Sequence, residues 1–272
     1  MKDFIIEWDI NPEIIKVFDV FPIRYYSLLF VLGLIISYYL LKKVYKTQNI
    51  DSSELEKLVI YVFTGTILGA RLGHCLFYDF SYYSNHVVEI FLPIRKNTNG
   101  NWFLSGFQGL ASHGGAIGIL ISLFIFSLKN KIRFSCLVDR VSLVAPIAAA
   151  FIRLGNFMNS EIIGKPTNSD FGVIFLQVDK LPRHPTQIYE AFIYLISFFI
   201  LQKFYKSSFN KKCGQTFGLL LILIFTSRFI IEFFKINQVS FEKNLFLNMG
   251  QSLSIPFILI GLYLIIFKKH RS

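Results

Sequence analysis

The sequence has few cysteines and none of the short motifs that mark common soluble enzymes. Its three cysteines, Cys75, Cys136 and Cys213, are odd in number and far apart, so they match neither a disulfide framework nor a metal-ligand spacing. It also has no phosphate-binding P-loop, no dinucleotide fingerprint and no Gly-x-Ser-x-Gly turn of a serine hydrolase. We therefore expect a functional site that uses no metal and no cofactor.

Internal repeats, low-complexity tracts and domain linkers are absent as well, which predicts one domain over residues 1–272. The first 23 residues lack the basic start and continuous apolar core of a signal peptide, and instead carry five acidic residues and two prolines. We expect this segment to be an ordered arm on a membrane surface.

Apolar residues dominate what is present: 53% of the chain is hydrophobic, 17% is aromatic and the mean hydropathy is +0.52. A soluble domain is less apolar than this. A membrane span needs about 20 apolar residues, and seven runs approach that length. We predict an all-α integral membrane protein whose seven transmembrane helices cover residues 25–41, 58–79, 110–128, 134–152, 188–202, 216–234 and 249–267.

The net charge of +11 is distributed as membrane topology requires, and we expect no nucleic-acid partner. Of the 28 lysines and arginines, half lie in the short segments 42–57, 129–133, 203–215 and 268–272. The other segments between the spans are longer and hold fewer lysines and arginines. The positive-inside rule then predicts a cytoplasmic C-terminus, an outside N-terminus and a small outward-facing head formed by the N-terminal arm and the outer loops.

This orientation places most polar residues of the spans toward the outer face. An unpaired charge at the membrane centre costs about 2.5–3.5 kcal/mol on insertion scales, so a shared polar chamber is expected there. Snorkelling at helix ends explains any one of these residues but explains the set poorly. The residues concerned are Tyr26, Arg71, His74, His113, Arg153, Glu190, Arg228, Glu232 and Gln251.

The segment 147–167 carries the strongest signal. Arg153 and Asn156 share one helix face, and Asn159, Glu161 and Gly164 follow within eight residues. A guanidinium beside amides at the edge of an apolar run suits a phosphate at a membrane surface. The alternative is a helix end with ordinary polar residues.

A second signal is the run His113-Gly114-Gly115 at the outer mouth of the third span. Histidine transfers protons near neutral pH, and the glycines let a substrate approach, although they also suit close helix packing. In the sixth span, Arg228 and Glu232 are four residues apart and can pair.

Several longer stretches together resemble the prolipoprotein diacylglyceryl transferase family. They are GARLGHCLFYD (69–79), HGGAIG (113–118), RLGNFMNSEIIGKPT (153–167), RHPTQIYE (183–190), RFIIEFF (228–234) and MGQSLSIP (249–256), in family order. The resemblance implies transfer of the diacylglyceryl group of phosphatidylglycerol to the lipobox cysteine of preprolipoproteins, with glycerol phosphate as second product. It also implies a bacterial cytoplasmic (inner) membrane protein.

From the motifs and the resemblance together, we expect His113 and Arg228 to be catalytic. The residues expected to bind substrate are Arg153, Tyr26, Asn156, Asn159, Glu161, Gly164, Gly114, Gly115 and Glu232. One position departs from the family, in which a tyrosine often precedes the arginine of the sixth span by four residues. Here that position is Ile224.

Two other classes remain open. A transporter or channel for an anionic solute would use the same chamber as a passage, but predicts polar residues on both faces and internal repeats. A non-catalytic assembly factor is compatible with the composition.

Overall fold

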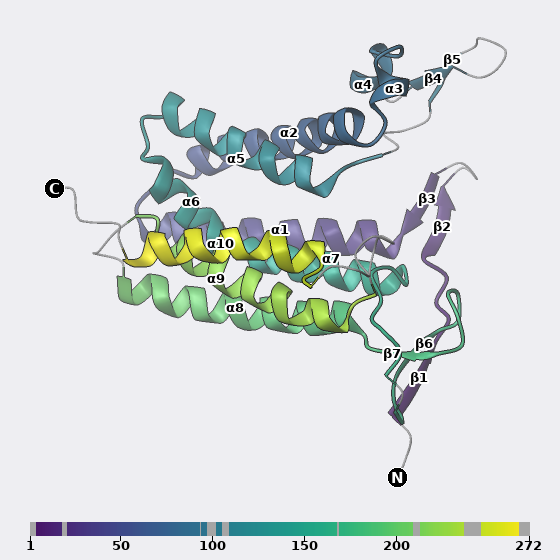
Figure 1. Ribbon diagram of the computed structural model, residues 1–272. Coiled ribbons are helices and arrows are strands. Elements are labelled where there is room, and N and C mark those ends of the chain that lie inside the picture. Colours follow the sequence, from purple (N-terminus) through teal and green to yellow (C-terminus); the bar gives the residue numbers. More distant parts are fainter. Residues whose placement is uncertain are drawn as a thin grey trace. The chain divides into compact units, whose positions relative to one another are not determined.

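The computed structural model describes residues 4–17, 21–92, 94–96, 102–104, 109–167, 169–208, 213–236 and 246–266, and most of these are helical (Figure 1). Contacts divide the chain into two compact units. The first comprises residues from 1–44 and 138–272, and the second comprises residues from 45–137. Each unit is described by itself.

The first unit contains five helices of the predicted spans: α1 (Tyr25–Thr47), α7 (Ala145–Met158), α8 (Thr186–Ser208), α9 (Gln215–Ile231) and α10 (Met249–Ile266). Helix α7 packs on α8, and α9 packs on both α8 and α10. Helix α1 approaches α7 closely because Gly33 has no side chain; a Cβ there would lie 2.7 Å from Cβ of Phe151. Gly218 and Gly261 give α9 and α10 the same close approach.

The fourth predicted run, 134–152, is not one continuous helix. It consists of α6 (Phe134–Ser142) and α7, which are bent by 45° at a short break. Pro146 lies in the first turn of α7. Proline has no N–H and is tolerated at a helix start rather than in its interior, which explains why the apolar run is interrupted there.

Asp139 of α6 caps the N-terminus of α9. Its carboxylate oxygens accept hydrogen bonds from the backbone N–H groups of Gly214, at 2.5 Å, and Phe217, at 2.8 Å. Gly214 has φ 105°, a left-handed conformation that suits glycine. A carboxylate satisfies the free N–H groups of a helix start and interacts favourably with its dipole. Asp139 thus contributes to the packing of α6 on the start of α9.

Short strands, which the all-α prediction did not include, order the N-terminal arm. Strand β1 (Phe4–Trp8) pairs in parallel with β6 (Phe171–Phe175), which pairs antiparallel with β7 (Pro182–Arg183). Strands β2 (Glu13–Val17) and β3 (Phe21–Arg24) form a hairpin. The Trp8 ring lies 4.4 Å from that of Phe157, so the sheet is anchored on the end of α7. The arm is thus joined to the segment that contains β6 and β7, and an outward-facing head stays a prediction.

The second unit is built on the contact between α2 (Ser52–Phe77) and α5 (Ser112–Lys129). Gly65, Gly69 and Gly73 of α2 face Gly114 and Gly118 of α5, and a Cβ on Gly114 would lie 2.3 Å from the carbonyl oxygen of Gly69. Small residues at this spacing bring helix backbones together in membranes.

The remaining elements of the second unit are α3 (Phe80–Tyr83), α4 (Val88–Phe91), β4 (Ile94–Lys96) and β5 (Trp102–Leu104). Arg71 of α2 holds α3 and α4 in place. Its guanidinium donates to the carbonyl oxygens of Glu89 and Ile90 and lies over the Tyr83 ring, 4.8 Å from the centroid. Arg71, which the sequence placed among the polar residues near the outer face, therefore has a structural role.

Within the described residues, five helices are long and apolar enough to cross a membrane, and six if the bent pair α6–α7 forms one span. The shorter apolar helix at 113–129 covers the third predicted run. Several helices extend beyond the predicted runs, since α1 continues to Thr47 and α8 to Ser208. The prediction of a helical, multi-pass membrane protein is confirmed in this form; seven spans and a single domain over 1–272 stay predictions.

Candidate functional site

The first unit holds Arg153 in a fixed position near the end of α7. Its Nε lies 2.8 Å from Oε2 of Glu190 on α8, and its Nη1 donates to Oδ1 of Asn156 at 3.1 Å. Tyr194, one turn after Glu190 on α8, contributes to the electrostatic surroundings of the guanidinium. Neighbouring elements thus determine the orientation of this arginine.

A chain of amide contacts extends from Arg153 into the following turn. The Asn156 amide nitrogen donates to Oε2 of Glu161 at 3.1 Å, and that of Asn159 donates to Oε1 at 3.2 Å. Asn156 is buried, whereas Glu161 is exposed. The predicted set Arg153, Asn156, Asn159 and Glu161 therefore forms one connected group.

Glu190 also accepts from a residue that the sequence reasoning did not select. Lys235 Nζ lies 2.7 Å from Oε1 of Glu190 and 3.6 Å from Oε2 of Glu232, and all three side chains are buried. The expected pair of Arg228 with Glu232 is wrong: within the described residues Glu232 forms its ion pair with Lys235 and packs against Gly250. The three-residue spacing of Glu232 and Lys235 suits an ion pair, and this spacing could have identified Lys235 from the sequence.

Arg228 differs from Arg153 in having no carboxylate partner among the described residues. It forms no ion pair in that part of the chain, and Tyr194 is one of its electrostatic neighbours. Its side chain is half-buried on α9. A guanidinium that no carboxylate neutralises retains its positive charge for an anionic ligand.

Tyr26, at the start of α1, lies against α7. A Cβ on Gly155 would lie 2.7 Å from Cδ2 of the Tyr26 ring, so only glycine allows this contact. The Tyr26 hydroxyl interacts electrostatically with both Glu161 and Arg153. The structure thus brings Tyr26 into the same group as the polar residues of α7.

Gly164 lies where three chain segments meet. A Cβ there would be 2.4 Å from the carbonyl oxygen of His184 and 2.9 Å from that of Phe234. Its N–H donates to His184 and its carbonyl oxygen accepts from Arg183. This geometry gives Gly164 a packing role, and substrate contact by Gly164 stays a prediction.

The start of α8 fixes the turn that contains Glu161. Gln187 Nε2 donates to the carbonyl oxygen of Glu161 at 2.6 Å, and Thr186 Oγ1 donates to that of Ile162 at 2.9 Å. His184 Nδ1 lies 3.2 Å from the Tyr189 hydroxyl, and burial lowers the pKa of His184. Thr186 and Gln187 therefore hold the backbone of this turn in place.

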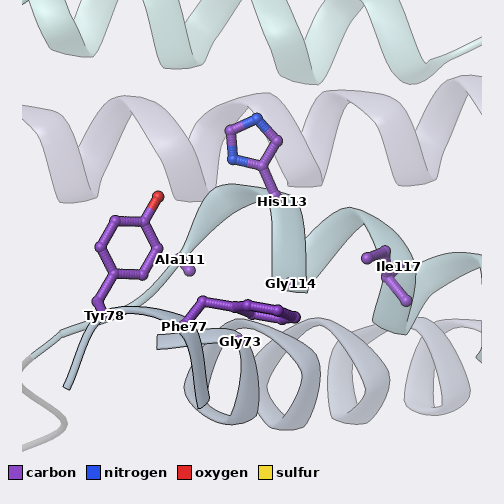
Figure 2. A pocket seen from close by; sticks show the side chains of 7 residues that line it. All are labelled: Gly73, Phe77, Tyr78, Ala111, His113, Gly114 and Ile117. Carbon is purple, nitrogen blue, oxygen red and sulfur yellow. The ribbon is translucent and has the colours of Figure 1, made fainter. Parts of the chain in front are cut away.

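His113 belongs to the second unit, at the start of α5. It lines a pocket of about 360 Å³ together with Gly73, Phe77, Tyr78, Ala111, Gly114 and Ile117. Figure 2 shows its imidazole pointing away from α2, and the side chain is exposed. Gly114 packs tightly against Gly69, whereas a Cβ on Gly115 would make only ordinary van der Waals contacts with Ala70 and Thr66. The pocket wall is mainly apolar, with the imidazole at its polar edge.

Ile224, the position that departs from the family pattern, lies in an apolar cluster. It packs with Ala149, Leu154 and Leu195 around Ala150, Ala191 and Tyr194. It contributes no polar group. Tyr194 of this cluster interacts electrostatically with both arginines. The sequence reasoning missed it because a tyrosine within an apolar helix resembles a core residue.

Comparisons with known proteins agree with the sequence resemblance. The prolipoprotein diacylglyceryl transferase family matches residues 12–267. A phosphatidylglycerol–prolipoprotein diacylglyceryl transferase of Bacteroides fragilis is 47% identical over 264 residues, covering 96% of this chain and 95% of the relative. Proteins of the same name from Porphyromonas gingivalis and Tolumonas auensis are 44% and 39% identical, cover 96% and 95% of this chain, and are themselves covered to 94% and 96%.

Proposed function

The chain belongs to the prolipoprotein diacylglyceryl transferase family, and from this premise we propose that it transfers the diacylglyceryl group of phosphatidylglycerol to a cysteine thiol of prolipoproteins. The bond between a glycerol carbon and a phosphate oxygen breaks, and a bond from that carbon to sulfur forms a thioether. Glycerol phosphate leaves with the bonding electron pair, and the thiol gives up its proton.

The two arginines of the first unit fit the charge that develops in this reaction. Negative charge grows on the phosphate oxygens as the glycerol carbon departs, and preorganised donors stabilise such charge best. Arg153 is held by Glu190 and Asn156, and Arg228 has no carboxylate partner among the described residues. Arg153 suits the lipid phosphate in the ground state, and Arg228 suits the leaving phosphate.

His113 is the proposed base for the thiol proton. A free thiol with a pKa near ~8.5 is only a few per cent ionised at neutral pH, and the thiolate is the nucleophile. The exposed imidazole at the polar edge of an apolar pocket suits a cysteine presented by a lipobox peptide. The proposed role of Glu161, Asn159 and Glu232 is to assist substrate binding by orienting the polar side chains that they contact.

The proposed setting is the bacterial inner membrane, with seven spans, an outside N-terminus, a cytoplasmic C-terminus and an outward-facing head. The apolar helices and the distribution of lysine and arginine support this arrangement. Phosphatidylglycerol then enters from the bilayer, and the lipobox peptide approaches from the outer face. An anionic-solute transporter is not favoured, because the relatives bear transferase names.

The observation that carries the proposal is that Arg153 is held by Glu190 and Asn156 while Arg228 has no carboxylate partner among the described residues, in a chain of this family. Purified protein supplied with phosphatidylglycerol and a lipobox peptide should give a peptide heavier by one diacylglyceryl group. A peptide with serine in place of the cysteine should remain unmodified, since a hydroxyl is a far weaker nucleophile than a thiol. Absence of the mass gain with folded wild-type protein would contradict the proposal.

A further inference from the structure

Lys235 is a buried lysine that lies between two buried carboxylates of the first unit. It directly follows the single helical turn Glu232–Phe234 at the end of α9. Only 4% of its side chain is exposed, and the side chains of Glu190 and Glu232 are exposed by 0% and 8%. Lysine is almost never fully buried unless its charge is paired. The role of this lysine is therefore to be found in its partners.

The backbone holds Lys235 in place independently of its side chain. Lys235 forms an isolated antiparallel bridge with Gly164. Beside this bridge, the N–H of Lys165 donates to the carbonyl oxygen of Phe234 at 2.7 Å. These backbone contacts remain when the side chain of Lys235 is replaced, so a substitution there tests the ammonium group rather than the path of the chain.

The ammonium group contacts Glu190 more closely than Glu232. Its Nζ donates to Oε1 of Glu190 at 2.7 Å, which is a short charge-assisted hydrogen bond. Its distance of 3.6 Å to Oε2 of Glu232 is too long for a hydrogen bond. The other oxygen of Glu190, Oε2, lies 2.8 Å from Nε of Arg153. Glu190 is thus shared between two cations, one at each oxygen.

This sharing changes the charge that Arg153 presents to an anion. A carboxylate paired with Arg153 alone would neutralise the guanidinium and weaken its attraction for a phosphate, because the fields of the two opposite charges nearly cancel. With Lys235 at the opposite oxygen, two cations share one carboxylate, and these three groups carry a net positive charge. Glu232 offsets this charge from a longer distance. Glu190 can therefore fix the direction of Arg153 without cancelling its charge.

We propose that Lys235 is a further positioning residue of the transfer reaction, which neutralises Glu190 and so keeps the charge of Arg153 available to the phosphate of phosphatidylglycerol. This inference rests on the proposed transferase function. Because Arg153 is assigned to the lipid phosphate in the ground state, loss of Lys235 should raise KM for phosphatidylglycerol more than it lowers kcat.

The test measures transfer to a lipobox peptide at varied phosphatidylglycerol for Lys235→Met and Lys235→Arg. Methionine keeps an unbranched apolar stem but removes the charge, whereas arginine keeps the charge. A hydrogen bond between charged groups corresponds to about tenfold to a hundredfold in an equilibrium constant. We expect KM for phosphatidylglycerol to rise by this factor in Lys235→Met and to stay near the wild-type value in Lys235→Arg. KM for the peptide should be nearly unchanged in both variants.

Lys165 provides the matched control. Its exposed side chain lies on the neighbouring segment, donates to the carbonyl oxygen of Phe233 at 2.9 Å and forms no ion pair in the part of the chain that the structure describes. Lys165→Met removes the same charge without removing a contact to Glu190, so KM for phosphatidylglycerol should hardly change. Equal rises in KM for Lys165→Met and Lys235→Met would overturn the inference, because positive charge in general, and not the contact with Glu190, would then be responsible.

A double variant separates charge compensation from a structural role. If Lys235 acts by neutralising Glu190, then Glu190→Gln in the Lys235→Met background should lower KM for phosphatidylglycerol again, because the carboxylate that needed compensation is gone. This variant also replaces Lys235→Met in the comparison if the single variant does not accumulate. Absence of recovery, or failure of both variants to accumulate as folded protein, would overturn the inference, since Lys235 would then serve only to anchor the end of α9. An inactive wild-type protein would instead refute the transferase function.

Discussion

Glu190 Oε2 lies 2.8 Å from Arg153 Nε although the Glu190 side chain is fully buried. The same carboxylate lies 2.7 Å from Lys235 Nζ. Burial of an ionised carboxylate is expensive unless cations and hydrogen bonds compensate it. One acidic residue on α8 therefore sets the position of the arginine of α7 and joins it to the chain segment after α9.

Replacing Glu190 with glutamine should destabilise the protein. Removing one member of a buried ion pair typically costs about 3–5 kcal/mol, because the partner charges remain buried without compensation. Here Arg153 and Lys235 would both be affected. We expect the apparent melting temperature in detergent to fall by several degrees and the transfer rate to fall with it, because Arg153 loses one of its fixed contacts.

The exposed pair Glu13–Arg24 provides the matched control. Its atoms are 3.1 Å apart, yet 51% of the arginine side chain and 26% of the glutamate side chain are exposed. Solvent screens such a pair, so Glu13→Gln should cost at most about 1 kcal/mol. Equal melting temperatures for the two variants would contradict the importance assigned to Glu190.

Arg153→Lys should abolish most of the transfer activity although it conserves the charge. Lysine presents a compact ammonium and cannot offer the planar pair of donors that a phosphate diester accepts. It also cannot reproduce the separate Nε and Nη1 contacts with Glu190 and Asn156. Activity should be measured at equal membrane levels of the two proteins. Near wild-type turnover would mean that Arg153 is an ordinary helix-end charge.

Much of the helical framework follows from local sequence. Apolar runs predict the helices because a span must satisfy its own backbone hydrogen bonds, and helical structure is observed in most of each of the seven runs. The exception is the run broken before Pro146. A proline at a helix start resembles a proline within a span when hydropathy alone is considered.

Contacts between distant segments could not be predicted in the same way. The pairing of β1 with β6 joins residues about 167 positions apart in register, as Phe4 opposite Phe171 illustrates. The role of Lys235 depends on Glu190 coming from another helix. Sequence spacing identified Arg153, Asn156 and Glu161 because they lie within nine residues of the chain, whereas Lys235 reaches the group only through tertiary packing.

The loop between β6 and β7 should loosen in acid. Hydrogen bonds from Arg183 hold the pKa of Asp179 below the ordinary carboxyl value of 3.8, and this pair lies outside the helices. A lowered carboxyl pKa stabilises the folded state above the unfolded-state pKa, and this contribution is lost as pH falls through the folded-state pKa. Because the carboxylate is partly exposed, the effect should be at most about 1 kcal/mol.

Hydrogen exchange of residues 171–183 measures this directly. The wild-type segment should exchange faster as pH falls below the ordinary carboxyl range, after correction for intrinsic rates. Asp179→Asn should exchange at the faster rate even at neutral pH. A segment whose protection does not change with pH would exclude the ion pair as its clamp.

The topology can be tested with single cysteines introduced at Asn85 and Asn130 in a cysteine-free background. Both residues are exposed and lie outside the long helices. The positive-inside rule places the loop of Asn85 outside and that of Asn130 in the cytoplasm. A membrane-impermeant thiol reagent added to intact spheroplasts should label only the first. Labelling of both from one side would contradict the seven-span arrangement.

The last prediction concerns His113 and the thiol proton. General-base assistance is typically worth about 10²–10⁴ in rate, so His113→Gln should lose activity in that range. Glutamine keeps much of the volume and some hydrogen bonding but removes the base. Raising the pH toward the thiol pKa of about 8.5 should restore part of the rate, because the substrate then ionises without assistance.

Lipid binding distinguishes this role from a structural one. The phosphate contacts are assigned to the arginines, so His113→Gln should bind phosphatidylglycerol as wild type does. If the imidazole only orients the start of α5, glutamine should serve nearly as well and turnover should be normal. A variant that neither binds lipid nor recovers at high pH would instead show that His113 maintains the pocket formed with Phe77, Tyr78 and Ile117. Retained lipid binding together with recovery at high pH is the outcome that a proton acceptor requires.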